Sequence, residues 1–136
     1  MISYCVAVVR PRYARMLIAD LAAKTSVPFE ILLWLNVDDP EFDAYLEDRA
    51  ADGWPIVVVG RTPDNIGMRA YLDLFRAARH PLIVQIDDDV LRVSRGIAER
   101  ALRIFAAHPE IRQVVADVWP DDLTTGARPP MHPYRC

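Results

Sequence analysis

Three consecutive aspartates, Asp87, Asp88 and Asp89, directly follow the apolar run of residues 82–86. Carboxylates this close raise one another's free energy unless a cation or strong hydrogen-bond donors lie among them. Side chains alternate along an extended backbone, so Asp87 and Asp89 can point to one side while Asp88 points to the other. Two converging carboxylates suit a hard cation such as Mg²⁺ or Mn²⁺, which usually takes its remaining ligands from phosphate. The triplet therefore predicts a site for a divalent ion and a diphosphate.

A second interpretation of the triplet needs no ligand: one aspartate caps the following turn and the others are solvated. Capping needs only one aspartate, however, and the strand that we predict over residues 82–86 is too apolar for the edge of a sheet. The common phosphate loops are missing, because the sequence has no GxGxxG after its first apolar run and no GxxxxGK[ST]. Metal and side chains would therefore hold the phosphates.

The elements that must position the triplet alternate along the chain. Short apolar runs rich in β-branched residues predict buried strands over residues 2–9, 29–35, 55–60, 82–86 and 113–119. Helical spacing predicts helices over residues 13–24, 40–52, 68–79 and 97–108. Such long crossovers imply a doubly wound α/β domain, with a mainly parallel sheet and helices on both faces. Ligands of these sheets bind beyond the carboxyl ends of the strands, where the triplet lies.

Local signals predict the ends and faces of the helices. Asp39 suits the N-cap of the second helix, with Pro40 in the first helical position and Gly53 as the C-terminal cap. The residues that we expect to face the sheet are Tyr13, Met16, Leu17 and Leu21 in the first helix, Phe42, Tyr45, Leu46 and Ala50 in the second, Met68, Leu72 and Phe75 in the third, and Ile97, Ala101, Ile104 and Phe105 in the fourth.

Composition describes a globular protein. The 136 residues are 52% hydrophobic and 26% charged, with a formal net charge of -3. These values exclude wholesale disorder, and no basic stripe suits nucleic acid. No apolar stretch reaches the ~18 residues of a membrane span, and neither Cys5 nor Cys136 has metal-ligand spacing, so we expect a cytoplasmic protein. We assign residues 1–119 to the α/β domain and the proline-rich residues 120–136 to a tail.

Four segments together resemble the N-terminal, nucleotide-sugar-binding half of a family 2 glycosyltransferase with the GT-A fold. They are VAVVRPRYARMLIADLAA, FEILLWLNVDD, DNIGMRAYLDLFRAARHPLIVQIDDDV and GIAERALRIFAAHPEIRQVVADV. The resemblance covers residues 3–118 and implies that Asp87 and Asp89 are the DxD aspartates that hold Mn²⁺ or Mg²⁺. The nucleotide-sugar-binding residues that it implies are Val9, Arg10, Asn36, Asp38, Asn65, Gly67, Arg69 and Asp88.

The chain departs from the family pattern at two places. The second strand of family members commonly ends in DDGS or DNGS, whereas this chain offers Asn36 or Asp38 in place of the base-reading aspartate. The second departure is at the end of the chain. The resemblance implies that an acceptor-binding half and a catalytic base follow the DxD motif, so residues 120–136 are either a tail or the truncated start of that half, and no catalytic base is assigned. Arg10 and Arg69 have the alternative of being ordinary surface charges. The downstream carboxylates, which suit a solvated tail better than a base, are Asp117, Asp121 and Asp122.

Three functions compete. The first is a glycosyltransferase that moves a sugar from a nucleotide-diphosphate sugar, with a UDP-sugar favoured, to an unidentified acceptor. The second is a non-catalytic module that binds a nucleotide-sugar or a metal and acts with a partner chain. The third is a Mg²⁺-dependent phosphotransfer enzyme that uses the same carboxylate pair. We also expect self-association into a homo-oligomer to cover apolar surface.

Overall fold

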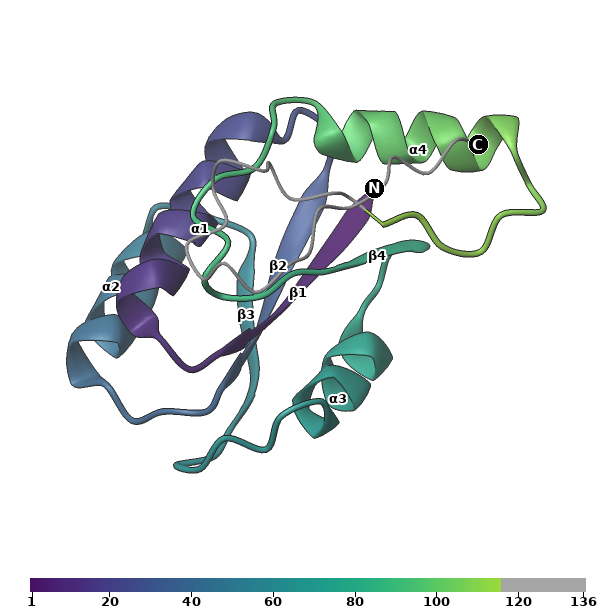
Figure 1. Cartoon of the computed structure of the whole chain (residues 1–136). Helices are drawn as coiled ribbons and strands as arrows, with labels where there is room; N and C mark the ends of the chain where they lie inside the picture. Colours follow the sequence, from purple (N-terminus) through teal and green to yellow (C-terminus); the bar gives the residue numbers. More distant parts are fainter. Residues whose placement is uncertain (116–136) are drawn as a thin grey trace, which may run out of the picture.

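The computed structural model describes residues 1–115, in which strands and helices alternate as the sequence predicts (Figure 1). The strands are β1 (Ile2–Val8), β2 (Phe29–Leu35), β3 (Ile56–Arg61) and β4 (Leu82–Gln85). The helices are α1 (Pro11–Lys24), α2 (Pro40–Ala51), α3 (Arg69–Ala77) and α4 (Ile97–Ala107). Of the predicted fifth strand, residues 113–115 are not in a strand, and residues 116–119 lie outside the described residues, as do residues 120–136.

The sheet is parallel and four-stranded, in the order β3-β2-β1-β4. β1 pairs on both sides, so that Cys5 lies opposite Leu32 of β2 and Gln85 of β4. Within residues 1–115, β4 is therefore an edge strand, and the prediction of a strand too apolar for an edge is wrong for this part of the chain. Burial along β4 alternates between half-buried and exposed side chains, because only one face of this strand is well covered.

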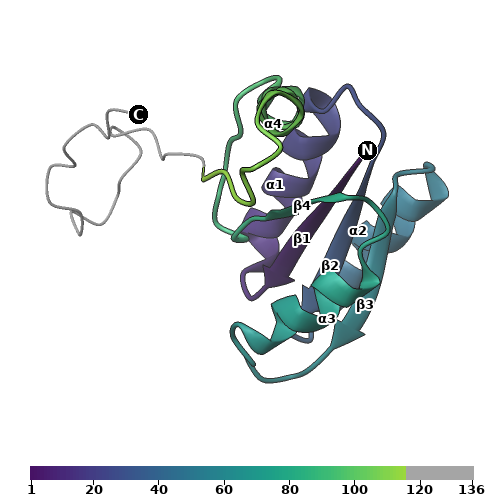
Figure 2. The same ribbon diagram turned by 90° about the vertical axis from the view of Figure 1, so that its right-hand side faces the viewer.

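Helices cover both faces of the sheet, which confirms the doubly wound α/β architecture. On one face, α1, α2 and α4 pack in a core cluster with the alternate residues Tyr4 and Val6 of β1. On the other face, α3 packs against a smaller cluster that includes Cys5 and Leu32. Figures 1 and 2 show α3 on the opposite side of the sheet from α1 and α2. Because α3 has only nine residues, it covers its face thinly.

α1 turns a different face to the sheet from the one predicted. Its buried residues are Ala14, Leu17, Ile18 and Leu21. Tyr13 and Met16, which we expected to face the sheet, are exposed. The buried residues form one stripe at i, i+3, i+4 and i+7 spacing, and the apolar residues beside that stripe remain at the surface.

α3 is also rotated relative to the prediction. Met68 and Leu72 are 64% and 55% exposed, while Ala70, Tyr71 and Leu74 are buried. This rotation brings the Tyr71 ring over the sheet and its hydroxyl to the end of β4. Of the three predicted inward residues, only the partly buried Phe75 packs on the sheet.

The faces of the other two helices agree better with the sequence. In α2, Phe42 and Leu46 are buried and Tyr45 is half-buried, but Ala50 is exposed. In α4 the buried residue is Ala98. The four inward residues predicted for α4, which are all half-buried, are Ile97, Ala101, Ile104 and Phe105.

The predicted ends of α2 are confirmed. Asp39 Oδ1 accepts a hydrogen bond from the Phe42 N–H at 2.9 Å, as an N-cap side chain does. At the other end, Gly53 adopts a φ of +79°, and the Trp54 N–H donates to the Arg49 carbonyl at 3.0 Å. Glycine suits this position because it enters the left-handed region without steric strain.

A buried carboxylate supports the fold on the α3 side of the sheet. Glu30 Oε1 accepts hydrogen bonds from Ser3 Oγ at 2.7 Å and from the Arg79 N–H at 2.9 Å. Arg79 Nε and Nη2 donate to Glu30 Oε2 at 2.8 and 2.6 Å. Burial raises the pKa of Glu30, but these hydrogen bonds outweigh burial, and the pKa lies below its usual value.

Among residues 1–115, every helix is too short or too polar to span a lipid bilayer.

Candidate functional site

The carboxyl ends of the parallel strands meet at one edge of the sheet. The Asn36 N–H donates to the Val8 carbonyl at 2.8 Å, and the Ile86 N–H donates to the Cys5 carbonyl at 3.1 Å. The residues that follow β1, β2 and β4 therefore start from a common edge. The acidic triplet lies there, at the end predicted for a ligand site in a doubly wound sheet.

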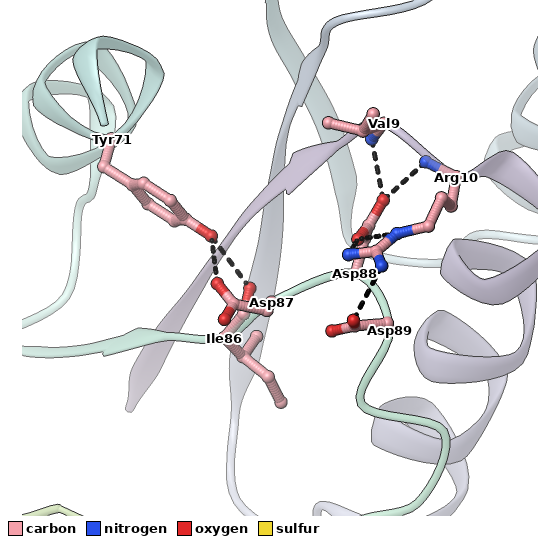
Figure 3. A network of polar contacts seen from close by, with 7 residues as sticks. All are labelled: Val9, Arg10, Tyr71, Ile86, Asp87, Asp88 and Asp89. Carbon is pink, nitrogen blue, oxygen red and sulfur yellow. Dashed lines mark hydrogen bonds and ion pairs between the residues drawn. The ribbon is translucent and has the colours of Figure 1, made fainter. Parts of the chain in front are cut away.

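Asp88 is the buried member of the triplet, with 2% of its surface exposed. Its Oδ2 accepts hydrogen bonds from the backbone N–H groups of Val9 at 2.7 Å and Arg10 at 2.6 Å. Its Oδ1 accepts from Arg10 Nε at 3.1 Å and Nη2 at 2.8 Å (Figure 3). Because these donors occupy both oxygens, Asp88 fixes the turn between β1 and α1. Protein donors already engage both oxygens of Asp88, for which the resemblance implied contact with the nucleotide-sugar.

Arg10 joins two members of the triplet. Its Nη1 lies 2.7 Å from Asp89 Oδ2, while Nε and Nη2 hold Asp88. The Arg10 side chain is 48% exposed and that of Asp89 is 44% exposed, so this second contact is open to solvent. The hydrogen bond to Asp88 is the main cause that raises the pKa of Arg10, and the charges of Asp88 and Asp89 add to it. The guanidinium is therefore the cation that lies among these carboxylates.

Asp87 has a different partner. The Tyr71 hydroxyl lies 3.2 Å from Asp87 Oδ1 and 3.2 Å from the Ile86 carbonyl oxygen, to which it can donate (Figure 3). Burial raises the pKa of Tyr71, and the negative charge of Asp87 raises it further, so the hydroxyl remains protonated at neutral pH. Tyr71 thus orients the Asp87 carboxylate. The sequence analysis missed this residue, because its role becomes visible only once the buried face of α3 is known.

The donor atoms fit a divalent ion in part. Asp87 and Asp89 are exposed and offer hard carboxylate oxygens, whereas Asp88 is buried. Arg10 pairs with Asp88 and Asp89, while Asp87 contacts the uncharged Tyr71 hydroxyl, so the three carboxylates carry more negative charge than the one guanidinium neutralises. Within residues 1–115, no three or more His, Cys, Asp or Glu side chains surround a common ion position. Water and phosphate would thus supply most of an octahedral shell.

Asn36, at the end of β2, holds the loop between β3 and α3. It is 5% exposed, and its Oδ1 accepts hydrogen bonds from Thr62 Oγ1 and the Ile66 N–H, both at 3.2 Å. Because a backbone N–H must face an acceptor, the Ile66 contact fixes which end of the amide is the oxygen. Asn36 Nδ2 is buried and has no hydrogen-bond partner in the described part of the chain. Asp38 is exposed and pairs with Arg61 at 3.4 Å.

The remaining predicted residues shape the turn before α3. Asn65 Oδ1 accepts a hydrogen bond from the Gly67 N–H at 2.8 Å, and Gly67 adopts a φ of +57°. Arg69 is exposed at the start of α3. No hydrogen bond or ion pair within residues 1–115 joins Asn65, Gly67 or Arg69 to the triplet. The structure thus brings Val9 and Arg10 to the aspartates, and α3 connects to them through Tyr71 alone.

The segment after the triplet is tied to α1. Asp20 Oδ2 accepts a hydrogen bond from the Val93 N–H at 2.7 Å, and Lys24 Nζ donates to the Val93 carbonyl at 2.8 Å. Asp20 and Lys24 also pair with each other at 2.7 Å. Asp20 interrupts the apolar positions of α1, and such a polar residue is a usable signal for a side chain that satisfies a nearby backbone. These contacts fix the path by which the chain leaves Asp89.

Comparisons with known proteins support the fold. No protein-family model matches the chain, and neither does any curated protein. Among solved structures, S. aureus TarS 1-349 matches with a TM-score of 0.66 and 15% identity, covering 79% of this chain and 33% of that chain. A second S. aureus TarS structure matches with a TM-score of 0.65 and 16% identity, covering 79% and 20%.

A third match is S. aureus TarS 1-349 in complex with UDP-GlcNAc, with a TM-score of 0.63, 16% identity, and coverage of 79% of this chain and 32% of that chain. The chain thus spans 33% or less of the length of these TarS chains. At 15–16% sequence identity, the similarity to the TarS structures shows a shared fold. This chain has a parallel α/β fold similar to that of the matched part of TarS.

Proposed function

We propose that this chain binds a nucleotide-diphosphate sugar, with a UDP-sugar favoured, and contributes to transfer of the sugar to an acceptor as a family 2-like glycosyltransferase. One observation carries the proposal. Asp87 and Asp89 are exposed at the carboxyl edge of a sheet whose fold matches TarS, a protein that has been determined in complex with UDP-GlcNAc. Carboxylates at this edge are in position to hold a divalent ion on a diphosphate.

Each residue at the edge has a distinct part in this proposal. Asp87 and Asp89 hold Mn²⁺ or Mg²⁺, which when bound stabilises negative charge on the departing nucleoside diphosphate. Tyr71 orients Asp87 through its hydroxyl, 3.2 Å from the carboxylate. Asp88 holds the turn at Val9 by accepting its N–H at 2.7 Å, and so fixes the backbone that faces the nucleotide. Tyr71 and Asp88 thus hold Asp87 and the Val9 backbone in place before the ligand arrives.

The loop before α3 supplies the other wall of the proposed nucleotide site. Asn65 and Gly67 form its turn, and Asn36 anchors it from β2. Arg69 is exposed next to this turn and is the proposed phosphate contact. Asp38, at the end of β2, is the more exposed of the two candidates for contact with the base, because Asn36 is buried and its oxygen is already used.

The test is calorimetric titration of the full chain with UDP-GlcNAc, with and without Mn²⁺. We expect binding that depends on Mn²⁺ and that Asp87→Asn abolishes. Asp48→Asn is the matched control, because Asp48 is an exposed carboxylate on α2 and its substitution changes the net charge equally. Binding that is unchanged without metal, or equally weak in both variants, would refute the metal assignment.

The titration, together with an assay for hydrolysis and sugar transfer, decides between the proposed function and its alternatives. Slow hydrolysis of the bound sugar-nucleotide, or transfer to an added acceptor, is expected of a glycosyltransferase and not of a non-catalytic module that acts with a partner chain. Equal binding of nucleoside triphosphates, without preference for a sugar, is expected of a phosphotransfer enzyme. A cytoplasmic location and a homo-oligomeric state remain predictions.

A further inference from the structure

Arg10 contacts two aspartates that have different surroundings. Its Nε and Nη2 lie 3.1 and 2.8 Å from the buried Oδ1 of Asp88, whereas Nη1 lies 2.7 Å from Asp89, which is 44% exposed. The guanidinium is planar and carries its donors in a fixed fork, so it can keep one partner while it loses the other. The contact with Asp88 is sheltered by protein. The contact with Asp89 is the one that a ligand can displace.

We propose that Arg10 is an internal counter-cation for Asp89, which must release Asp89 before a divalent ion can bind there. This inference rests on the proposed function, because it concerns regulation of the same metal site. A guanidinium and a divalent ion both carry positive charge, and their repulsion is strong at the few ångströms that separate neighbouring ligands of one carboxylate. Arg10 therefore lowers the affinity of the free protein for metal.

The anchor on Asp88 determines where Arg10 goes when it releases Asp89. Nε and Nη2 stay on Asp88, and the backbone N–H groups of Val9 and Arg10 hold that carboxylate in place at 2.7 and 2.6 Å. The freed Nη1 group therefore remains at the carboxyl edge of the sheet. Phosphate oxygens accept charge-assisted hydrogen bonds from an arginine N–H group such as this one. Arg10 thus opposes metal binding alone and favours metal that arrives with a diphosphate.

The experiment measures Mn²⁺ binding to the full chain in the absence of nucleotide, by the loss of the free-Mn²⁺ paramagnetic resonance signal. It compares the wild type with Arg10→Gln and Arg12→Gln. Arg12 is exposed two residues away and makes no ion pair with residues 1–115, so its substitution changes the charge equally and removes no contact with the triplet. We expect Arg10→Gln to bind Mn²⁺ about fivefold more tightly than Arg12→Gln, the size expected for an exposed ion pair.

A second arm repeats the titration with saturating UDP. Bound UDP should raise the Mn²⁺ affinity of the wild type by a larger factor than that of Arg10→Gln, since coupling between two ligands requires a group that responds to both. Arg10→Lys covers the case in which Arg10→Gln fails to fold. A lysine keeps the charge but cannot span both aspartates, so its Mn²⁺ affinity should exceed that of the wild type.

The outcomes distinguish failure of the proposed metal site from failure of the proposed role of Arg10. If the wild type and all variants fail to bind Mn²⁺ both without nucleotide and with saturating UDP, the metal site itself is refuted, and the proposed function falls with it. If the wild type binds Mn²⁺ but Arg10→Gln binds no more tightly than Arg12→Gln, the metal site stands and the role of Arg10 is overturned. An equal effect of UDP in the wild type and Arg10→Gln would also overturn it.

Discussion

Replacement of Asp88 by alanine tests whether this residue supports the fold or contacts a ligand. The substitution removes the acceptor for two backbone N–H groups, those of Val9 and Arg10, and for two donors of the Arg10 guanidinium. The two backbone N–H groups lose their acceptor at about 1–2 kcal/mol each, whereas the half-exposed Arg10 guanidinium keeps water and Asp89 as partners, so the free energy of unfolding falls by about 2–4 kcal/mol. That is a large part of the ~5–15 kcal/mol by which a typical domain is stable.

Asp89→Ala provides the comparison, because Asp89 is exposed and contacts only the Nη1 end of Arg10 among residues 1–115. An exposed ion pair contributes about 0.2–1 kcal/mol, so this variant should unfold close to the wild type. Asp88→Asn, which keeps one acceptor oxygen, should fall between the two. Urea denaturation followed by circular dichroism measures all three. If Asp88→Ala and Asp89→Ala lose stability equally, the structural role given to Asp88 is wrong.

Three further predictions concern the sheet. The pKa of Glu30 is lower in the folded protein than its unfolded value near 4.5, so the stabilisation by Glu30 is complete above that value and is lost as the pH falls through the folded pKa. In Glu30→Gln, the free energy of unfolding should therefore depend less on pH in this acidic range. Gly60→Ala would place a Cβ in steric overlap with the Trp34 ring, so we expect the free energy of unfolding measured by urea denaturation to fall by about 1–3 kcal/mol. No loss would show that the indole moves freely. Burial raises the pKa of the Cys5 thiol to about 12. In a Cys136→Ser background, we therefore expect a thiol reagent to label Cys5 no faster than the protein unfolds. Rapid labelling of the native protein would contradict this burial.

Local sequence signals predicted the elements well. The second strand was expected over residues 29–35, and β2 spans Phe29–Leu35. Asp39 and Pro40 marked the start of α2 because capping depends on neighbouring residues alone. The parallel order followed from the long crossovers, which leave few other topologies.

The faces of α1 and α3 were harder to predict, because these helices carry apolar residues on more than one side. Met16 and Leu72 are exposed although they fit a helical stripe. Small residues such as Ala14 and Ala70 face the sheet instead, and periodicity gives them little weight. The edge position of β4 has a similar cause, since the apolar content of a short run does not tell whether one face or both faces are covered.

The roles within the triplet depend on contacts between distant parts of the chain. Alternation along an extended backbone was expected to separate Asp88 from Asp87 and Asp89. Asp88 is indeed buried and the other two are exposed, but residues 88 and 89 lie in a turn that the Val90 N–H closes by donating to the Asp87 carbonyl at 3.1 Å, so the turn and not strand alternation produces the separation. The partners of Asp88 lie in the turn after β1, far away in sequence. No local pattern could name Arg10 as the counter-cation or Tyr71 as the group that orients Asp87.

The location of bound Mn²⁺ tests the central claim most directly, and nuclear magnetic resonance can measure it. In an isotope-labelled sample with a small amount of Mn²⁺ and saturating UDP, paramagnetic broadening falls steeply with distance from the ion. We predict that the amide signals of Val9, Asp87 and Asp89 broaden first, while that of Trp54, before the amino end of β3, stays sharp. Uniform broadening, or broadening centred on another part of the chain, would contradict a metal site at the carboxyl edge of the sheet.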